Sequence, residues 1–203
     1  ILRGLVGSEM CIRDSFYLRD VETRTADVRL LSAPGQGLVD GAVDWLVGLY
    51  ALDKEVDFSR DYTFAGGMFS SNYAIDRLAL YGELAANLAD DMRISVGLRA
   101  EQHESSYRDS AGVQFSPDDD LVGGRLLLER SLASGNLLYM SLTHGYKAGG
   151  FNTDGSLDAD LREFDPESLW NMEVGFKGSL MDERLALSAA LFRMQRRDVQ
   201  IST

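Results

Sequence analysis

The side chains that could perform acid–base, nucleophilic or metal chemistry are few in this chain. His103 and His144 are its only histidines, and Cys11 is its only cysteine, so no internal disulfide can form. The sequence contains no Gly-x-Ser-x-Gly nucleophile elbow, no glycine-rich phosphate loop and no His-Glu-x-x-His zinc motif. These observations argue against an enzyme, and we expect no catalytic residue, no metal ligand and no bound cofactor.

The chain is acidic, and most of the excess acid lies in three segments. Lys and Arg total 20 against 32 Asp and Glu, which gives a formal net charge of -12. This balance argues against nucleic acid as a partner, because phosphate binding needs clustered Lys and Arg. The acidic segments are 53–72, 104–120 and 147–167. They favour solubility, or alternatively a site for a divalent cation or a cationic ligand.

Apolar and polar residues alternate along most of the chain, which is the pattern of β-strands rather than of helices. In 92–103, every even residue up to Ala100 is apolar, while Arg93 and Glu101 lie at odd positions. A strand directs these two sets to opposite faces. About eight such segments are present. The clearest are 43–51, 77–86, 92–103 and 170–180, and the weaker ones are 24–32, 121–131, 136–146 and 184–195.

The links between these segments alternate between short and long. The short links are 87–92, 132–136 and 180–184, whereas the long ones are the three acidic segments. This order predicts an up-and-down antiparallel sheet with its long loops at one end, as in outer-membrane barrels with tight periplasmic turns. Strands of about ten residues also match the length that crosses a membrane at a tilt. No run of about 18 apolar residues occurs, which excludes a membrane-spanning helix.

Alternation alone leaves several architectures open. In a soluble β-sandwich, which would be an interaction module, the apolar face is buried in a core and the charged face is solvated. In a membrane barrel, the apolar face meets lipid and the charged face encloses the interior. A complete small outer-membrane barrel is a further alternative, because about eight strands suffice to close one around its own side chains.

Five phrases, in the same order, resemble the barrel of TonB-dependent outer-membrane receptors. The most specific is GYKAGGFN at 145–152, which in that family marks the junction between a strand and an extracellular loop. The others are TADVRLLS with VDWLVGLY (25–32 and 43–50), LALYGELAANLADDMRISVGLRAEQHESSY (78–107), FDPESLWNMEVGFKGSL (164–180) and ERLALSAALFRMQRRDVQI (183–201).

The resemblance implies an all-β fold, namely part of an antiparallel up-and-down transmembrane β-barrel. The chain would supply about eight strands of a larger barrel that has about 22 strands. It also implies a receptor in the bacterial outer membrane for energised uptake of a scarce ligand. The ligand is most often a ferric siderophore, and otherwise cobalamin, haem or a carbohydrate. The expected partners are outer-membrane lipid, the small-molecule ligand and the TonB–ExbB–ExbD complex, which would contact a missing N-terminal part.

The resemblance divides the chain into two parts, residues 1–19 and 20–203. The opening ILRGLVGSEMCIRDS is a poor signal peptide, and GSEMCIRDS resembles a tail translated from non-coding or sequencing-derived DNA. We expect residues 20–203 to form the partial receptor barrel. The chain stops at DVQIST, within or just after a strand-like segment. We therefore expect a fragment that needs neighbouring strands, because unpaired sheet edges are costly in a bilayer.

The GYKAGGFN motif predicts positions for several of its own residues. Tyr146 would lie at the outer membrane boundary, where its ring is buried and its hydroxyl hydrated. Lys147 would extend its ammonium into water, Gly149 and Gly150 would turn the backbone through positive φ, and Phe151 would close the loop over the rim. Six side chains have types that suit ligand contact, although we assign none: Tyr62, Phe64, Tyr107, Phe115, Phe151 and Asn152.

Overall fold

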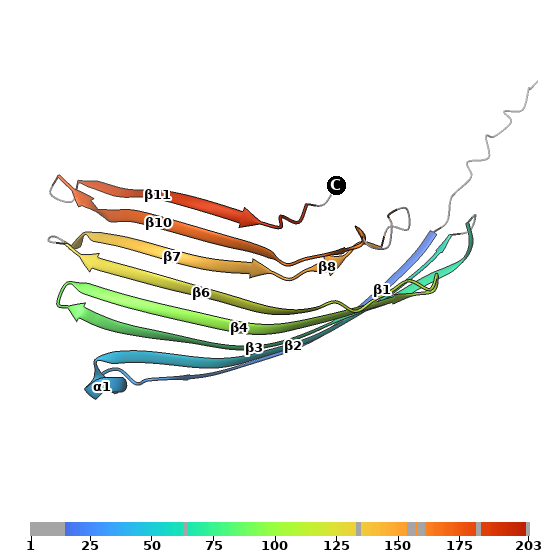
Figure 1. The fold of residues 1–203 in the computed structure, drawn as a ribbon, viewed down its shortest axis with the longest axis horizontal. Coiled ribbons are helices and arrows are strands. Elements are labelled where there is room, and N and C mark those ends of the chain that lie inside the picture. Colours follow the sequence, from blue (N-terminus) through green and yellow to red (C-terminus); the bar gives the residue numbers. More distant parts are fainter. Residues whose placement is uncertain are drawn as a thin grey trace, which may run out of the picture.

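The computed structural model describes residues 15–62, 65–132, 135–153, 157, 161–181 and 184–201. Within these residues the chain is almost entirely β-strand, as predicted, and one short helix, α1 (Leu38–Gly41), lies in the turn between the first two strands (Figure 1). None of the described helical structure is long and apolar enough to cross a membrane.

The long strands form one antiparallel sheet in which neighbours along the chain are also neighbours in space. Its order is β1-β2-β3-β4-β6-β7-β10-β11, which confirms the predicted up-and-down topology. Figure 1 shows α1 and the tight turns at one end, here called the turn end, and β8 near the other, here called the rim end. The long strands are β1 (Ser15–Leu31), β2 (Val43–Tyr62), β3 (Ala65–Ala89), β4 (Met92–Asp109), β6 (Asp118–Ser131), β7 (Leu137–Lys147), β10 (Glu167–Leu180) and β11 (Leu185–Arg197). The short ones are β5 (Gln114–Phe115), which pairs with β4, and β8 (Gly150–Phe151), which pairs with β9 (Glu163–Phe164).

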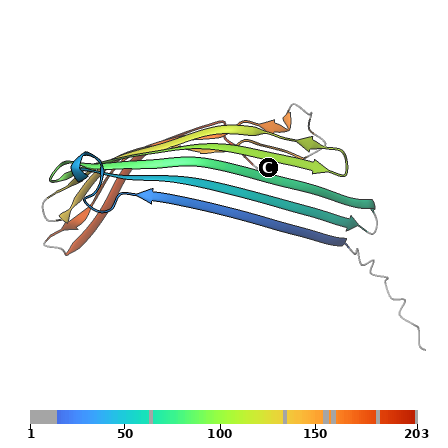
Figure 2. The ribbon, with the colours of Figure 1, turned by 90° about the horizontal axis from the view of Figure 1, so that it is seen from below.

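The sheet is curved (Figure 2), and the strand register decides which side chains share each face. Arg77 on β3, His103 on β4 and Asp119 on β6 lie opposite one another and form one row. Side chains on this face also meet across an intervening strand. The Tyr81 hydroxyl donates to Asp27 Oδ1 at 2.6 Å although β2 separates their strands. Side chains converge in this way only on the inside of a curve, so the polar face is the concave one.

The convex face carries the predicted apolar stripe. Val96 and Leu98 on β4 are 40% and 65% exposed, whereas Ser95 and Glu101 on the concave face of the same strand are 6% and 7% exposed. No second layer of described residues covers the convex face, as the core of a β-sandwich would require. The apolar side chains therefore face outward, as they do in a membrane barrel.

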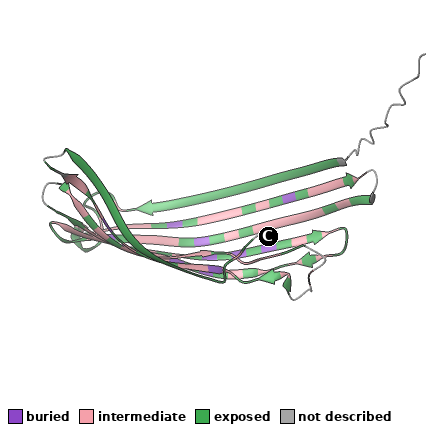
Figure 3. Ribbon diagram, turned by 90° about the horizontal axis from the view of Figure 1, so that it is seen from above, coloured by how far each residue is buried: buried purple, intermediate pink, exposed green. Residues whose placement is uncertain are grey.

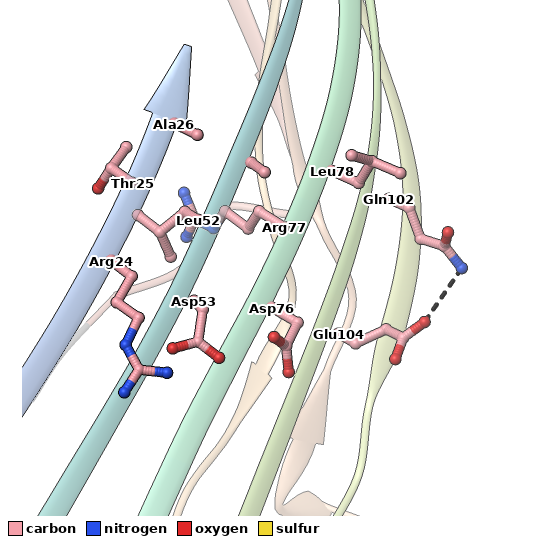
Figure 4. Close-up of a pocket in the computed structure, with 11 residues that line it drawn as sticks. Arg24, Thr25, Ala26, Leu52, Asp53, Asp76, Arg77, Leu78, Gln102 and Glu104 are labelled. Carbon is pink, nitrogen blue, oxygen red and sulfur yellow. Dashed lines mark hydrogen bonds between the residues drawn. The ribbon is translucent and has the colours of Figure 1, made fainter.

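A row of charged side chains ends the convex apolar stripe toward the rim. Figure 4 shows Arg24, Asp53, Asp76 and Glu104 extending from four adjacent strands around a shallow hollow of about 410 Å³. The register places these four residues opposite one another in that order. The next convex positions toward the turn end are Ala26, Ala51, Leu78 and the uncharged Gln102, and on β4 the apolar stripe begins at Ala100. The charged row therefore marks where hydrocarbon would end and the aqueous side begin.

Two of the predicted long loops are largely strand. β2 and β3 meet in a hairpin across 53–72, and β4 and β6 cover most of 104–120. The loop prediction was wrong because the alternation continues with its polarity reversed. Within 53–58 the acidic residues face the convex side, while Val56 and Phe58 face the concave side. Water covers the convex face beyond the charged row, so a strand there needs no outward apolar residue.

The sheet is open, and its two edge strands are β1 and β11. β1 begins at Ser15, so residues 15–19 are part of this strand. Figure 3 shows β1 exposed along its whole length. Within the described residues β1 pairs only with β2 and β11 only with β10. The closure that a complete small barrel requires is therefore absent from this sheet.

Candidate ligand-binding site

Charged side chains inside the sheet pair with one another on the concave face. Arg99 Nε donates to Glu101 Oε2 at 2.9 Å, and Arg125 Nη2 donates to Glu83 Oε2 at 3.0 Å. A carboxylate as buried as Glu101 needs such a partner, because an isolated buried charge is strongly unfavourable. The charged face therefore lines the inside of the curve with ion pairs, as predicted.

Tyr146 does not lie at the lipid boundary, so that expectation is wrong. Its hydroxyl accepts a hydrogen bond from Arg99 Nε at 3.1 Å and donates one to Glu101 Oε2 at 3.2 Å. Gly123 on β6 leaves room for the ring, because a Cβ there would lie 2.9 Å from Tyr146 Cε1. The ring is therefore held on the concave side by a buried ion pair and by a missing side chain on the neighbouring strand.

After β7 the chain turns across the concave face as a short segment, residues 147–152, here called the strap. The Gly149 N–H donates to Asp119 Oδ2 at 2.9 Å. Gln200 Nε2 donates to the Ala148 carbonyl oxygen at 2.8 Å. These bonds connect the strap to β6 on one side and to the segment after β11 on the other.

The two glycines of the strap are explained by close packing. A Cβ on Gly149 would lie 2.6 Å from the carbonyl oxygen of Phe164, and one on Gly150 would lie 2.8 Å from the Phe164 ring. Neither glycine has a positive φ. The predicted left-handed turn is therefore wrong, and glycine is needed here because the backbone passes directly against Phe164.

Phe151, at the end of the strap, packs into a group of rings on the concave face. It stacks on Phe115 with ring centroids 4.9 Å apart and 12° between the planes. Its ring centroid also lies 5.3 Å from that of Tyr107 and 5.7 Å from that of Tyr73. These four residues, here called the aromatic cluster, come from β3, β4, β5 and β8. Phe151 thus folds back over the rim end, as predicted.

A pocket of about 480 Å³ lies between the strap and the aromatic cluster. This volume is within the range of pockets that bind small molecules. The pocket, here called the rim pocket, opens on the concave face at the rim end. Its side walls include Tyr73, Arg77, His103, Tyr107, Lys147, Phe151 and Phe164.

The cations of the rim pocket form no ion pair with described residues of the kind found elsewhere on the concave face. Neither Arg77 nor Lys147 forms an ion pair with another described residue. Arg77 Nε and His103 Nδ1 are both buried, and neither has a hydrogen-bond partner in the described part of the chain. Unpaired buried polar atoms are costly, and a ligand that pairs them recovers that cost.

His103 contributes to the pocket as a neutral side chain. It is 3% exposed. Burial disfavours the charged form of an imidazole. A neutral imidazole offers one N–H donor and one nitrogen acceptor. The positive charge of the rim pocket therefore comes from Arg77 and Lys147.

Glu167, a second buried carboxylate, lies next to the strap. It accepts hydrogen bonds from the Gln200 backbone N–H at 3.1 Å and from Arg196 Nε at 2.6 Å. These two hydrogen bonds, that of Gln200 first, lower the pKa of Glu167 below its usual value. Because the Gln200 side chain also bonds the strap, the Glu167 carboxylate helps to fix the strap in place.

The other side chains considered for ligand contact lie apart from the rim pocket or at its margin. The Tyr62 hydroxyl is 2.6 Å from that of Tyr17 at the rim end of β1 and β2. The Asn152 N–H donates to the Arg162 carbonyl oxygen at 2.6 Å. Phe64 lies outside the described residues. Tyr107, Phe115 and Phe151 are thus the three that the fold brings together.

The structure also places His144 and the three aspartates that end the acidic segment 104–120. The ring centroids of His144 and Trp170 are 4.6 Å apart. Asp118 and Asp120 lie on the opposite face of β6 from Asp119, so the three carboxylates cannot converge. Among the described residues no group of three or more His, Cys, Asp or Glu is arranged to hold a metal ion.

Sequence reasoning missed Tyr73 and Arg77, although a signal for them exists. Tyr73 lies between the predicted loop 53–72 and the predicted strand 77–86, and Arg77 is the first residue of that strand. In 69–77 the large residues Phe69, Tyr73 and Ile75 share the odd positions with Arg77. This alternation indicates a strand whose apolar residues face the interior. It can be recognised once the apolar residues are known to change from the convex to the concave face beyond the membrane.

The comparison with protein families decides what kind of barrel this sheet belongs to. The family model for the β-barrel of TonB-dependent receptors, "TonB dependent receptor-like, beta-barrel", matches residues 13–203. This chain belongs to the TonB-dependent receptor family. The barrel segment is therefore located in the bacterial outer membrane, with its convex apolar stripe toward lipid.

Related receptors are known from Yersinia. The pesticin receptors of Yersinia enterocolitica serotype O:8 and of Yersinia pestis are both 27% identical to this chain over 169 residues. The match covers 78% of this chain and 25% of each receptor. This TonB-dependent receptor segment thus spans about a quarter of the length of these relatives.

Solved structures share the fold of the segment. The ferric yersiniabactin uptake receptor of Yersinia pestis superposes with a TM-score of 0.72 at 24% identity, over 93% of this chain and 30% of that receptor. The alcaligin outer-membrane receptor of Bordetella pertussis gives a TM-score of 0.71 at 19% identity, over 90% and 30%. The open sheet is therefore an arc of a TonB-dependent receptor barrel.

Proposed function

We propose that this chain is a middle-to-late barrel segment of a receptor that binds a ferric siderophore at the cell surface and imports it. Energy would come from the TonB–ExbB–ExbD complex through a part of the receptor outside this segment. The rim pocket carries the proposal. It reaches from the level of the convex charged row to the end of the sheet where such barrels have their extracellular loops.

The chemistry of the rim pocket supports an iron-chelate ligand. Ferric siderophores are oxygen-rich, and many are anionic, so Arg77 and Lys147 would attract them and Arg77 could hydrogen-bond their oxygens. The aromatic cluster offers a flat apolar wall beside these cations. Two receptors of the same fold are named for ferric yersiniabactin uptake and for alcaligin.

The mechanism under this proposal is binding and gated passage, without the making or breaking of covalent bonds in the ligand. The cations of the rim pocket would raise the local concentration of an anionic chelate. The paired charges deeper on the concave face, such as Arg99 with Glu101, would support a plug domain through further charge pairs and water. Release into the periplasm would follow when TonB acts on that plug.

The test is iron uptake by the complete receptor that carries this segment. It is expressed in a bacterial strain that lacks its own ferric-siderophore receptors, and 55Fe uptake is measured for a panel of ferric siderophores. We expect uptake of at least one chelate, and we expect deletion of TonB to abolish it. The Arg77→Gln/Lys147→Gln double variant should take up iron more slowly, while Arg108→Gln on the convex face should not.

The design separates loss of function from loss of folding. Outer-membrane abundance of each variant is measured by surface labelling, because a misassembled barrel would not reach the membrane. Uptake of no ferric siderophore by a receptor present at normal abundance would refute the proposal. Uptake that persists without TonB would refute its energetic part.

A further inference from the structure

We propose that the rim pocket takes a flat aryl group that bears an ionised oxygen, such as one phenolate or catecholate ring of the ligand. This inference rests on the proposed function and narrows its ligand class. The aryl ring would lie against Tyr73, Tyr107 and Phe151, and its oxygens would face Arg77 and His103. Aliphatic hydroxamate chelates would then bind this pocket less tightly.

The walls of the pocket favour an aromatic guest. Three rings of the aromatic cluster line it, and Phe164 lies beside the strap. Phe151 already makes one face-to-face contact, with Phe115, and is tilted by 44° and 76° to the rings of Tyr107 and Tyr73. The rings therefore lie at different angles around the pocket, so an aryl guest could stack on one ring and meet another edge-on. Such pairs contribute about 0.5–1.5 kcal/mol each beyond the burial of area, which an aliphatic chain cannot gain.

The polar groups of the pocket favour an oxygen anion on that guest. Arg77 has a buried Nε without a partner among the described residues, and it has no ion pair there. Lys147 supplies a second positive charge from the strap side. No hydrogen bond joins either cation to a carboxylate among the described residues. Glu101 accepts from Arg99 and Tyr146, Asp119 accepts from the Gly149 N–H, and Glu167 accepts from Arg196.

His103 makes the site suitable for a ring with more than one oxygen. Its Nδ1 is buried and has no described partner, on the same row as Arg77. A neutral imidazole can donate to an ionised oxygen or accept from a hydroxyl. A catechol or salicyl ring carries two adjacent oxygens, so one could face Arg77 while the other faces His103.

Binding to the complete receptor, purified in detergent, tests the inference with two 55Fe-labelled probes. One is the ferric complex of 2,3-dihydroxybenzoate, and the other is the ferric complex of acetohydroxamate. We expect the aryl complex to bind at least about 10-fold more tightly, as two ring contacts and one charged hydrogen bond would give. Arg77→Gln should weaken the aryl complex by about 10- to 100-fold, the loss expected for a hydrogen bond to a charged group.

Matched variants separate the pocket from general effects. Arg77→Lys keeps the charge and should retain part of the affinity, whereas Arg108→Gln removes a convex arginine and should leave it unchanged. Phe151→Leu keeps the apolar volume but loses the ring, and should weaken the aryl probe more than the hydroxamate probe. Heat-modified mobility in gels, recorded for each variant, confirms that the barrel is folded.

The possible outcomes distinguish this inference from the proposed function. Tighter binding of the hydroxamate probe, or equal binding that Arg77→Gln leaves unchanged, would overturn the aryl inference while a ferric-siderophore function stands. Failure of both probes and of every ferric siderophore in the uptake panel would overturn both. Selective aryl binding that depends on Arg77 would support both.

Discussion

Replacing Val96 by arginine tests the orientation on which the membrane assignment depends. Val96 lies in the middle of the convex apolar stripe on β4, and its cross-strand neighbours on that face are Leu84 and Leu126. No convex anion is next to it to pair with a guanidinium. An arginine that faces lipid near the bilayer midplane costs about 2–4 kcal/mol, which corresponds to a change of about 30- to 700-fold in the folding equilibrium.

The free energy of unfolding would be measured by denaturant titration of the complete receptor in phospholipid vesicles. Gln102→Arg is the matched control, because it lies on the same strand and face but beside the charged row, where the expected cost is only about 0–1 kcal/mol. Val96→Arg should therefore be less stable than the control by at least about 1 kcal/mol. Equal stability of the two variants would mean that the convex stripe does not face hydrocarbon, and the argument would fail.

Four further predictions concern packing, pH, the strap and the sheet edges. Gly175→Ala should destabilise the barrel by about 1–3 kcal/mol in the same titration, because a Cβ at this position would lie 2.3 Å from Tyr139 Cζ. A variant as stable as the wild type would contradict that packing. Folding lowers the pKa of Glu167 below 4.5, so its contribution is complete above pH 4.5 and is lost as the pH falls through the folded-state pKa. Hydrogen exchange at the Gln200 amide should accelerate over that acidic range. Glu167→Gln should remove this pH dependence of the exchange rate. An unchanged pH profile in that variant would reject the role of Glu167. Phe151→Ala should reduce the local stability of the strap by about 1–3 kcal/mol, seen as faster exchange at residues 147–152 with the β4 amides unaffected. The isolated chain should aggregate or remain unfolded in detergent micelles, because two edge strands present unpaired backbone groups; a cooperatively melting, heat-modifiable monomer would show otherwise.

Much of the fold was predictable from the period of the sequence. A strand directs successive side chains to opposite faces, so the even residues of 92–100 had to share one face whatever surrounded them. The short links at 87–92 and 132–136 had to be turns between antiparallel neighbours. The order of family phrases then predicted the type of barrel, which the family model confirms.

The candidate site was only partly predictable. Tyr107, Phe115 and Phe151 were recognised by residue type, but nothing in the local sequence places Phe151 within reach of Tyr73. That contact depends on the strap, and the strap depends on Asp119, Gln200 and the missing side chains at Gly149 and Gly150. These are relations between distant segments, which a single sequence read locally does not reveal.

By itself, the sequence determined which residues lie together on a strand face, because that follows from backbone geometry alone. Only the tertiary structure decided that the polar face is concave, that Tyr146 turns inward to a buried ion pair, and that Arg77 and His103 line a pocket. The physical reason is curvature. Bending the sheet brings side chains from non-adjacent strands into contact on the inner face and separates them on the outer one.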